Sequence, residues 1–187
     1  MVPITIILAD GYSDWEIAVL SGVGRAFYGA DIRFVSPDGG PIRSAGGIPI
    51  SHTDKFNPPS EGVVVVCGGP AFESDSTSDI SGALRQAREA GCIIAGICGG
   101  TIALARAGLL DNVKHTSNGP GYLGQHVADY SGAENYVDQP AALRAGDIIT
   151  APAPAPASFA VEVLKAAGLE AQKAEQIKHM LAAEHSN

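Results

Sequence analysis

The chain has 187 residues, of which 45% are hydrophobic and 17% charged, and 12 basic against 20 acidic side chains give a formal net charge of -8. A chain of this length buries a sizeable core as one domain, so predominant disorder and two large domains are excluded. We expect a single domain over 1–187, with a C-terminal helix and tail at 170–187. Its acidity would repel phosphate backbones and anionic membranes, so neither nucleic acid nor membrane is expected as a partner.

Cysteine usage indicates a reducing compartment. Cys67, Cys92 and Cys98 are few, odd in number and spread through apolar or glycine-rich segments, unlike the framework of a secreted mini-domain. Zinc-type spacings such as Cys-x-x-Cys are missing, so no metal is expected. No apolar run approaches the ~18 residues of a membrane span. The first apolar run is also too short for the core of a signal peptide. We therefore expect a cytoplasmic protein.

Predicted strands and helices alternate along the chain. Apolar runs predict strands at 3–9, 31–36, 63–67, 92–97 and 147–150. Helical spacing predicts helices at 14–28, 80–90, 99–107 and 158–167. Strands that are apolar throughout are typical of a parallel sheet covered on both faces. The alternation predicts an α/β fold, a three-layer sandwich around a mostly parallel sheet with right-handed crossovers.

Three further segments have distinct patterns. Glycine pairs and short β-type runs at 37–53 predict a small β excursion on the surface. The Ala-Pro run at 151–156 is too short for a domain linker, and we interpret it as a rigid loop on the active face. Apolar positions along 170–185 predict a helix that docks on the body or on a partner subunit.

The segment Gly-Ile-Cys-Gly-Gly at 96–100 follows an apolar strand and opens a helix. This is the context of a nucleophile elbow, with Cys98 in the place of serine. Glycines two residues to either side, Gly96 and Gly100, leave room for a sharp turn. The helix N-terminus favours the thiolate and predicts a lowered pKa and a reactive Cys98. The alternative is a buried small hydrophobe, which is the interpretation we give to Cys67 and Cys92.

Two glycines are candidate oxyanion donors. Gly69 follows the strand at 63–67, where parallel strands end and ligands collect in open α/β sheets. The backbone N–H groups of Gly69 and of Gly99, the residue after the nucleophile, form a natural pair of donors. The alternative for Gly68-Gly69-Pro70 is an ordinary turn.

Two titratable side chains are candidate partners of Cys98. Ser13 and Glu16 have the spacing of a helix capping box, but Glu16 also follows the first strand, at the edge of the sheet expected to hold Cys98. There it could exchange a proton with the thiol, most usefully with a raised pKa. His115 lies 17 residues after Cys98 and could return to the thiol as a base, although an exposed loop position is the alternative.

Together these segments resemble one known family. Residues 11–16 (GYSDWE), 68–70 (GGP), 95–101 (AGICGGT) and 108–118 (GLLDNVKHTSN) are similar to the ThiJ/PfpI family. This family belongs to the class I glutamine-amidotransferase-like superfamily and includes the Parkinson-disease protein deglycase. The resemblance covers all but the last ~18 residues. It implies a flavodoxin-like sandwich, a Cys98 nucleophile, a protonated carboxyl at Glu16, a histidine at His115 and a homodimer.

Departures from the family patterns narrow the expected chemistry. Peptidases of this type have a histidine directly after the nucleophile, where this chain has Gly99. Amidotransferases need a His-x-Glu further on, but His179 is followed by Met180 and Leu181. We therefore expect neither activity.

The leading hypothesis is a cofactor-independent hydrolase or lyase of the glyoxalase or deglycase type. It would act on small reactive carbonyl compounds such as methylglyoxal through the Cys98 thiolate, with Glu16 or His115 moving protons. The alternative is a redox-sensing or stress-protective protein in which Cys98 is oxidised. An FMN carrier is disfavoured because no Ser/Thr-rich phosphate loop follows the first strand.

Overall fold

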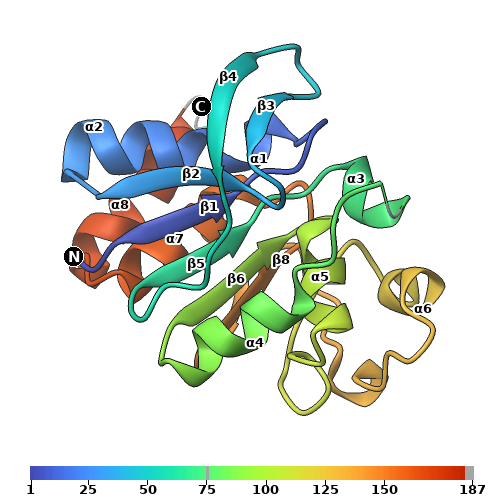
Figure 1. Cartoon of the computed structure of the whole chain (residues 1–187). Coiled ribbons are helices and arrows are strands. Elements are labelled where there is room, and N and C mark those ends of the chain that lie inside the picture. Colours follow the sequence, from blue (N-terminus) through green and yellow to red (C-terminus); the bar gives the residue numbers. More distant parts are fainter. Residues whose placement is uncertain (75, 184–187) are drawn as a thin grey trace.

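The computed structural model describes residues 1–74 and 76–183, which form an eight-stranded sheet between layers of helices (Figure 1). The strand order is β3-β4-β2-β1-β5-β6-β8-β7. Parallel pairing joins β1 (Ile4–Ile7), β2 (Ile32–Ser36), β4 (Pro49–Lys55), β5 (Val63–Val66), β6 (Ile93–Ile97) and β8 (Ile148–Ala151). The edge strands β3 (Gly40–Arg43) and β7 (Leu143–Ala145) pair antiparallel. The predicted three-layer α/β fold is confirmed.

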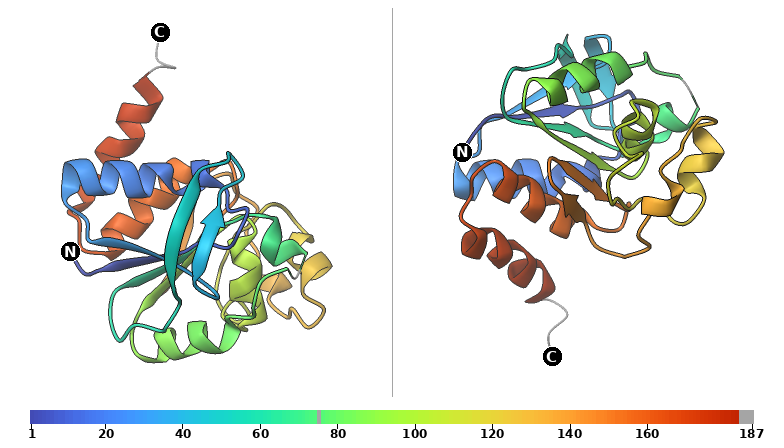
Figure 2. Two further views of the ribbon diagram at one scale, coloured as in Figure 1. Left: turned by 45° about the horizontal axis from the view of Figure 1, so that its top comes forward. Right: turned by 90° about the horizontal axis from the view of Figure 1, so that it is seen from below.

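The central strands are apolar throughout because both of their faces are covered. All four residues of β5 are buried, and successive side chains enter opposite cores. One core lies under α1 (Asp14–Ala18), the π-helical turn Val19–Val23, α2 (Gly24–Tyr28), α7 (Pro156–Ala166) and α8 (Ala171–Ala182). The other lies under α4 (Ser81–Glu89) and α5 (Gly100–Arg106). Figure 2 shows the two helical layers from two further sides, with α8 extending from the body beside α7.

Local departures from the predicted elements are few. The β excursion at 37–53 is a hairpin of β3 and β4, but β4 also pairs with β2, so the hairpin widens the main sheet. A π-helical turn interrupts the helix predicted at 14–28. Short elements that the sequence did not predict are α3 (Pro70–Glu73), α6 (Tyr122–His126), the 3-10 turn Ala133–Asn135 and strand β7. The predicted tail helix is α8, and the last part of that tail, 184–187, lies outside the described residues.

The parallel register brings three chain segments to one edge of the sheet. Ile7 pairs with Val66, and Val66 pairs with Gly96, so β1, β5 and β6 end side by side. The segments that follow these strands carry Glu16, Gly68 and Cys98. This carboxyl edge is where open α/β sheets bind their ligands. Within the described residues, no helix is long and apolar enough to cross a membrane.

Candidate functional site

Cys98 occupies a strained turn between β6 and α5. Its φ of 53° makes it the one non-glycine residue with positive φ in the described part of the chain, a conformation that costs an L-residue roughly 1–2 kcal/mol. Thr101 stabilises the turn, because its N–H and its Oγ1 donate to the Cys98 carbonyl oxygen over 3.0 and 2.6 Å. The thiol is half-buried. The predicted nucleophile-elbow geometry is confirmed.

The glycines around Cys98 are required by space. A Cβ on Gly100 would overlap the Val66 carbonyl oxygen. A Cβ on Gly96 would lie 3.0 Å from Leu104 Cδ1 and 3.1 Å from the Gly100 oxygen. Strand β6 and helix α5 therefore approach as closely as the sequence pattern predicted.

Glu16 on α1 is completely buried and faces the elbow. Its Oε2 accepts a hydrogen bond from Gly68 N–H over 2.9 Å, and the Cys67 thiol donates to the same oxygen over 3.9 Å. A Cβ on Gly68 would overlap Glu16 Oε2 and lie 2.7 Å from Cys98 Cβ. The carboxyl and the nucleophile thus meet across the space that this glycine leaves open.

The capping-box interpretation of Glu16 is wrong. Ser13 is the N-cap residue but makes no side-chain cap hydrogen bond. Its N–H, which Glu16 would have to bind, instead donates to the Gly68 carbonyl oxygen over 3.0 Å. The Glu16 carboxyl therefore does not cap the helix backbone, although a hydrogen bond from the Ser13 side chain lowers its pKa.

Glu16 and Cys98 shift each other's protonation. Burial raises the pKa of Glu16 to about 7, and the donors Cys98 and Gly68 oppose that rise. The direction agrees with the prediction. Burial raises the pKa of Cys98 to about 12, and the Glu16 carboxylate adds to the rise. The predicted lowering of the Cys98 pKa is wrong, because burial and a neighbouring anion outweigh the amide donors at the start of α5. At pH 7 the thiol therefore keeps its proton and Glu16 is about half ionised. The thiol donates a hydrogen bond to the ionised form of the carboxyl.

Asn118, which the sequence did not single out, touches the nucleophile. Its Nδ2 donates to Cys98 Sγ over 3.2 Å, while its Oδ1 accepts Ala153 N–H over 2.9 Å. A backbone N–H can be accepted only by the amide oxygen, so this second bond fixes which end of the side chain faces the sulfur. Ala153 belongs to the Ala-Pro segment at 151–156, whose predicted place on the active face is confirmed. Asn118 lowers the pKa of Cys98, so it favours the thiolate.

His115 lies in a cluster of its own. It is completely buried, so the alternative of an exposed loop position is wrong. Its Nδ1 is 2.8 Å from the Val113 oxygen and its Nε2 is 2.6 Å from the Tyr130 hydroxyl, and burial lowers its pKa. The rings of Tyr130 and Tyr136 pack edge-on against it. Both ring nitrogens are therefore engaged away from Cys98, and the structure does not bring this histidine to the thiol.

The two candidate oxyanion donors lie together. A Cβ on Gly99 would be 2.7 Å from the Gly69 oxygen and 3.3 Å from its nitrogen. The Gly99 N–H also lowers the pKa of Cys98 through a hydrogen bond. Gly69 and Gly99 are thus neighbours at the elbow, and their donation to an oxyanion stays a prediction.

A pocket of about 510 Å³ opens beside Asn118. Its lining residues are Ser117, Asn118, Gly119, Asp138, Gln139, Pro140, Pro152, Ala153 and Pro154.

On α6, the Tyr122 hydroxyl donates to Glu73 Oε1 of α3 over 2.6 Å. Burial, that hydrogen bond and the Cys98 charge raise the pKa of Tyr122, and a hydrogen bond with Asn118 opposes the rise. Among the described residues, no group of three or more His, Cys, Asp or Glu side chains is arranged to hold a metal ion.

Comparisons with known proteins agree with this architecture. The sequence pattern of the DJ-1/PfpI family matches residues 2–166. A Bacillus subtilis protein named "Uncharacterized protease YoaZ" is 34% identical over 164 residues, covering 82% of this chain and 77% of that protein.

Solved structures extend the similarity to the whole chain. The DJ-1 superfamily protein Atu0886 from Agrobacterium tumefaciens superposes with a TM-score of 0.90 at 37% identity, over 100% of both chains. Drosophila melanogaster DJ-1beta superposes with a TM-score of 0.72 at 25% identity, over 97% of this chain and 98% of that one. The chain therefore belongs to the DJ-1/PfpI family.

Proposed function

We propose that this protein is a cofactor-independent enzyme that converts small reactive carbonyl compounds, such as methylglyoxal, to hydroxy acids through Cys98. The observation that carries the proposal is the buried pair of Glu16 and Cys98. A general base is most effective when its pKa lies near the working pH, and the pKa of Glu16 is raised to about 7. Glu16 is also the carboxyl whose charge and hydrogen bond act on the Cys98 thiol.

In the first step Glu16 accepts the Cys98 proton while the sulfur attacks the aldehyde carbon. The protonated Glu16 then returns the proton to the carbonyl oxygen, which gives a neutral hemithioacetal. The developing oxyanion would lie against the N–H groups of Gly69 and Gly99. Loss of one such donor typically costs ~3 kcal/mol.

In the second step the carboxylate removes the proton from the former aldehyde carbon and delivers it to the adjacent carbon, while the hydroxyl proton of the hemithioacetal passes to the oxygen of that adjacent carbon. A thioester of the 2-hydroxy acid results, with no net oxidation. Water then adds to the thioester, lactate leaves, and Cys98 recovers its proton. Asn118 supports both stages because its amide donor stabilises negative charge on the sulfur.

Peptide hydrolysis, suggested by the name of the Bacillus relative, fits this site less well. Cleavage of an amide needs an acid that protonates the departing amine. Asn118, which contacts Cys98 from the loop after α5, carries no transferable proton at neutral pH, so Glu16 would have to serve as both the base and the acid. His115 is held by Val113 and Tyr130 instead.

The test is turnover of methylglyoxal to lactate by wild type, Cys98→Ala, Glu16→Gln and His115→Ala. The proposal predicts no turnover without Cys98, a loss of at least about 100-fold without the Glu16 base, and retained turnover by His115→Ala if that variant folds. Equal turnover by wild type and Cys98→Ala would rule the proposal out.

One observation favours a second candidate, a redox sensor. Glu16 Oε1 is buried without a hydrogen-bond partner among the described residues. A protonated carboxyl there could donate to an oxygen of a Cys98 sulfinic acid and stabilise it. Stoichiometric oxidation of Cys98 by peroxide, with no turnover of any carbonyl compound, would select this alternative.

A further inference from the structure

The pocket beside Asn118, whose amide contacts Cys98, has a negative charge in its lining and no cation among its described lining residues. Its lining includes the exposed carboxylate of Asp138 and, among the described lining residues, no lysine, arginine or histidine. In the described part of the chain, Asp138 forms no ion pair with a lysine, arginine or histidine. Its charge therefore acts directly on whatever enters the pocket.

The groups that contact the thiol do not offset this charge. Asn118 and the Gly99 amide are neutral donors, and the charge that acts most strongly on Cys98 is the Glu16 carboxylate. The hydroxyl of Tyr122, whose pKa responds to the charge of Cys98, donates a hydrogen bond to a second carboxylate, Glu73. A substrate carboxylate or phosphate that approaches Cys98 through this pocket would thus meet like charges and, among the described lining residues, no cation.

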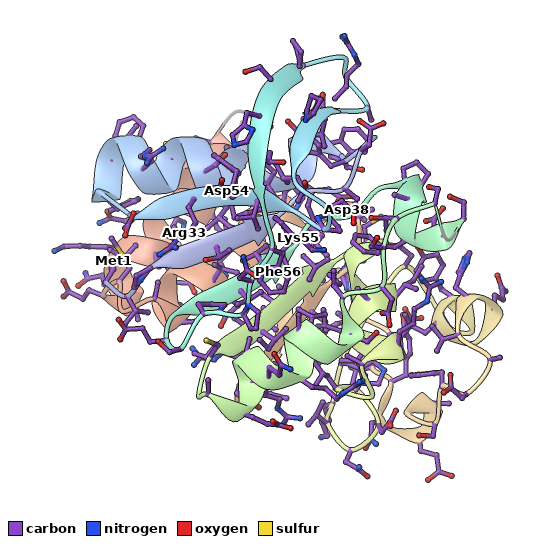
Figure 3. The ribbon with its side chains drawn as sticks, viewed as in Figure 1. Met1, Arg33, Asp38, Asp54, Lys55 and Phe56 are labelled. Atoms are coloured by element: carbon purple, nitrogen blue, oxygen red, sulfur yellow. The ribbon has the colours of Figure 1, made fainter. Side chains whose placement is uncertain are left out.

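Two basic side chains, Arg33 and Lys55, lie over another part of the sheet. Arg33 and Lys55 line a separate cavity with Asp54, and Figure 3 labels these three residues in the region of β2 and β4. Strands β6 and β8, which carry the nucleophile and the Ala-Pro loop, are three and four strands further along the sheet from β2. These cations therefore do not screen the pocket.

We propose that Asp138 is a specificity-determining residue, which admits uncharged or cationic carbonyl compounds to Cys98 and repels anionic ones. This inference rests on the proposed function for its carbonyl chemistry. The charge selection itself concerns access to the thiol and can be measured without any turnover. A unit charge in the lining of a partly solvated pocket changes the rate at which a charged reagent enters by about three- to tenfold.

The test uses two alkylating agents of similar size, neutral iodoacetamide and anionic iodoacetate. Rates of Cys98 alkylation are followed by mass spectrometry of the peptide that contains it, and the ratio of the two rates is divided by the ratio for N-acetylcysteine. We expect the normalised ratio to exceed about 5 in wild type at low ionic strength and to approach 1 in about 0.5 M salt.

Variants assign the effect to Asp138. Asp138→Asn is expected to lower the normalised ratio by about threefold and Asp138→Lys to bring it to about 1 or below. Asp129→Asn removes the same charge from an exposed position outside the pocket and is expected to leave the ratio unchanged. A wild-type ratio near 1, or equal effects of the Asp138 and Asp129 variants, would overturn the inference.

The outcomes keep the two proposals apart. Turnover of methylglyoxal that depends on Cys98, with a normalised ratio near 1, would retain the enzyme and remove the charge selection. A ratio above about 5 without turnover of any carbonyl compound would retain the selection and remove the carbonyl enzyme.

Discussion

The side-chain amide of Asn118 donates a hydrogen bond to the sulfur of Cys98 over 3.2 Å. The Ala153 N–H bound to Asn118 Oδ1 holds that amide in one orientation. A neutral donor at this position stabilises a thiolate but cannot take up its proton. Proton transfer at the site therefore falls to Glu16, and the roles of the two residues can be tested separately.

Asn118→Asp should weaken the nucleophile. The substitution removes the donor and places a second carboxylate beside the sulfur, so the pKa of Cys98 rises further. A hydrogen bond to a charged group contributes ~1.5–3 kcal/mol, which corresponds to a loss of roughly 10- to 100-fold in the rate of Cys98 alkylation by iodoacetamide. The exposed Asn112→Asp is the charge-matched control. Equal alkylation rates in the two variants would show that Asn118 does not support the thiolate.

Glu16→Gln should change how stability depends on pH. The pKa of Glu16 is raised in the folded state to about 7 from 4.5, so wild type loses stability as pH rises from about 4.5 through 7. Glutamine does not ionise and avoids that loss. The free energy of unfolding of Glu16→Gln should therefore gain on wild type by up to about 3 kcal/mol between pH 4 and 9.

Denaturant titrations of Glu16→Gln across that pH range measure the gain. The exposed Glu89→Gln variant serves as the control and should keep a constant offset from wild type. A constant offset for Glu16→Gln as well would mean that burial does not perturb this carboxyl.

The Cys67 thiol should lower the pKa of the Glu16 base. Its thiol donates to Glu16 Oε2 and to the Ser13 carbonyl oxygen, and the bond to Glu16 lowers the pKa of that carboxyl. Cys67→Ala removes the donor and should move the acid limb of kcat/KM to higher pH by roughly half a unit. Cys67→Ser supplies a stronger donor and should move it to lower pH. Cys92→Ser, a buried thiol outside the site, should leave the limb in place.

The strained backbone at Cys98 predicts that glycine there is more stabilising than alanine, the reverse of the usual order. Because φ is 53° at this residue, Cys98→Gly should be more stable than Cys98→Ala by about 1 kcal/mol. At Cys92, where φ is not positive, glycine should be the less stable of the same pair. Thermal unfolding of the four variants measures both differences. Glycine below alanine at position 98 would mean that the turn is not strained in solution.

Much of this architecture follows from local sequence features. The apolar runs predicted the central strands, and the glycines around Cys98 predicted the elbow, because both reflect short-range packing. The identity of the thiol's neighbours depends on where long loops return. His115 and Asn118 lie three residues apart on the same segment, and spacing alone could not tell which one reaches Cys98. The low pKa expected for Cys98 failed for a similar reason, because the burial and the charge of Glu16 are tertiary effects.

The most direct test of the account is the titration of Glu16 itself, followed through the side-chain carboxyl carbon by NMR. We predict a midpoint near pH 7 in wild type and a higher midpoint in Cys98→Ala, since that variant lacks the thiol donor. A wild-type midpoint near the ordinary value of 4.5, unchanged in Cys98→Ala, would contradict the proposal that this carboxyl is the base for the Cys98 nucleophile.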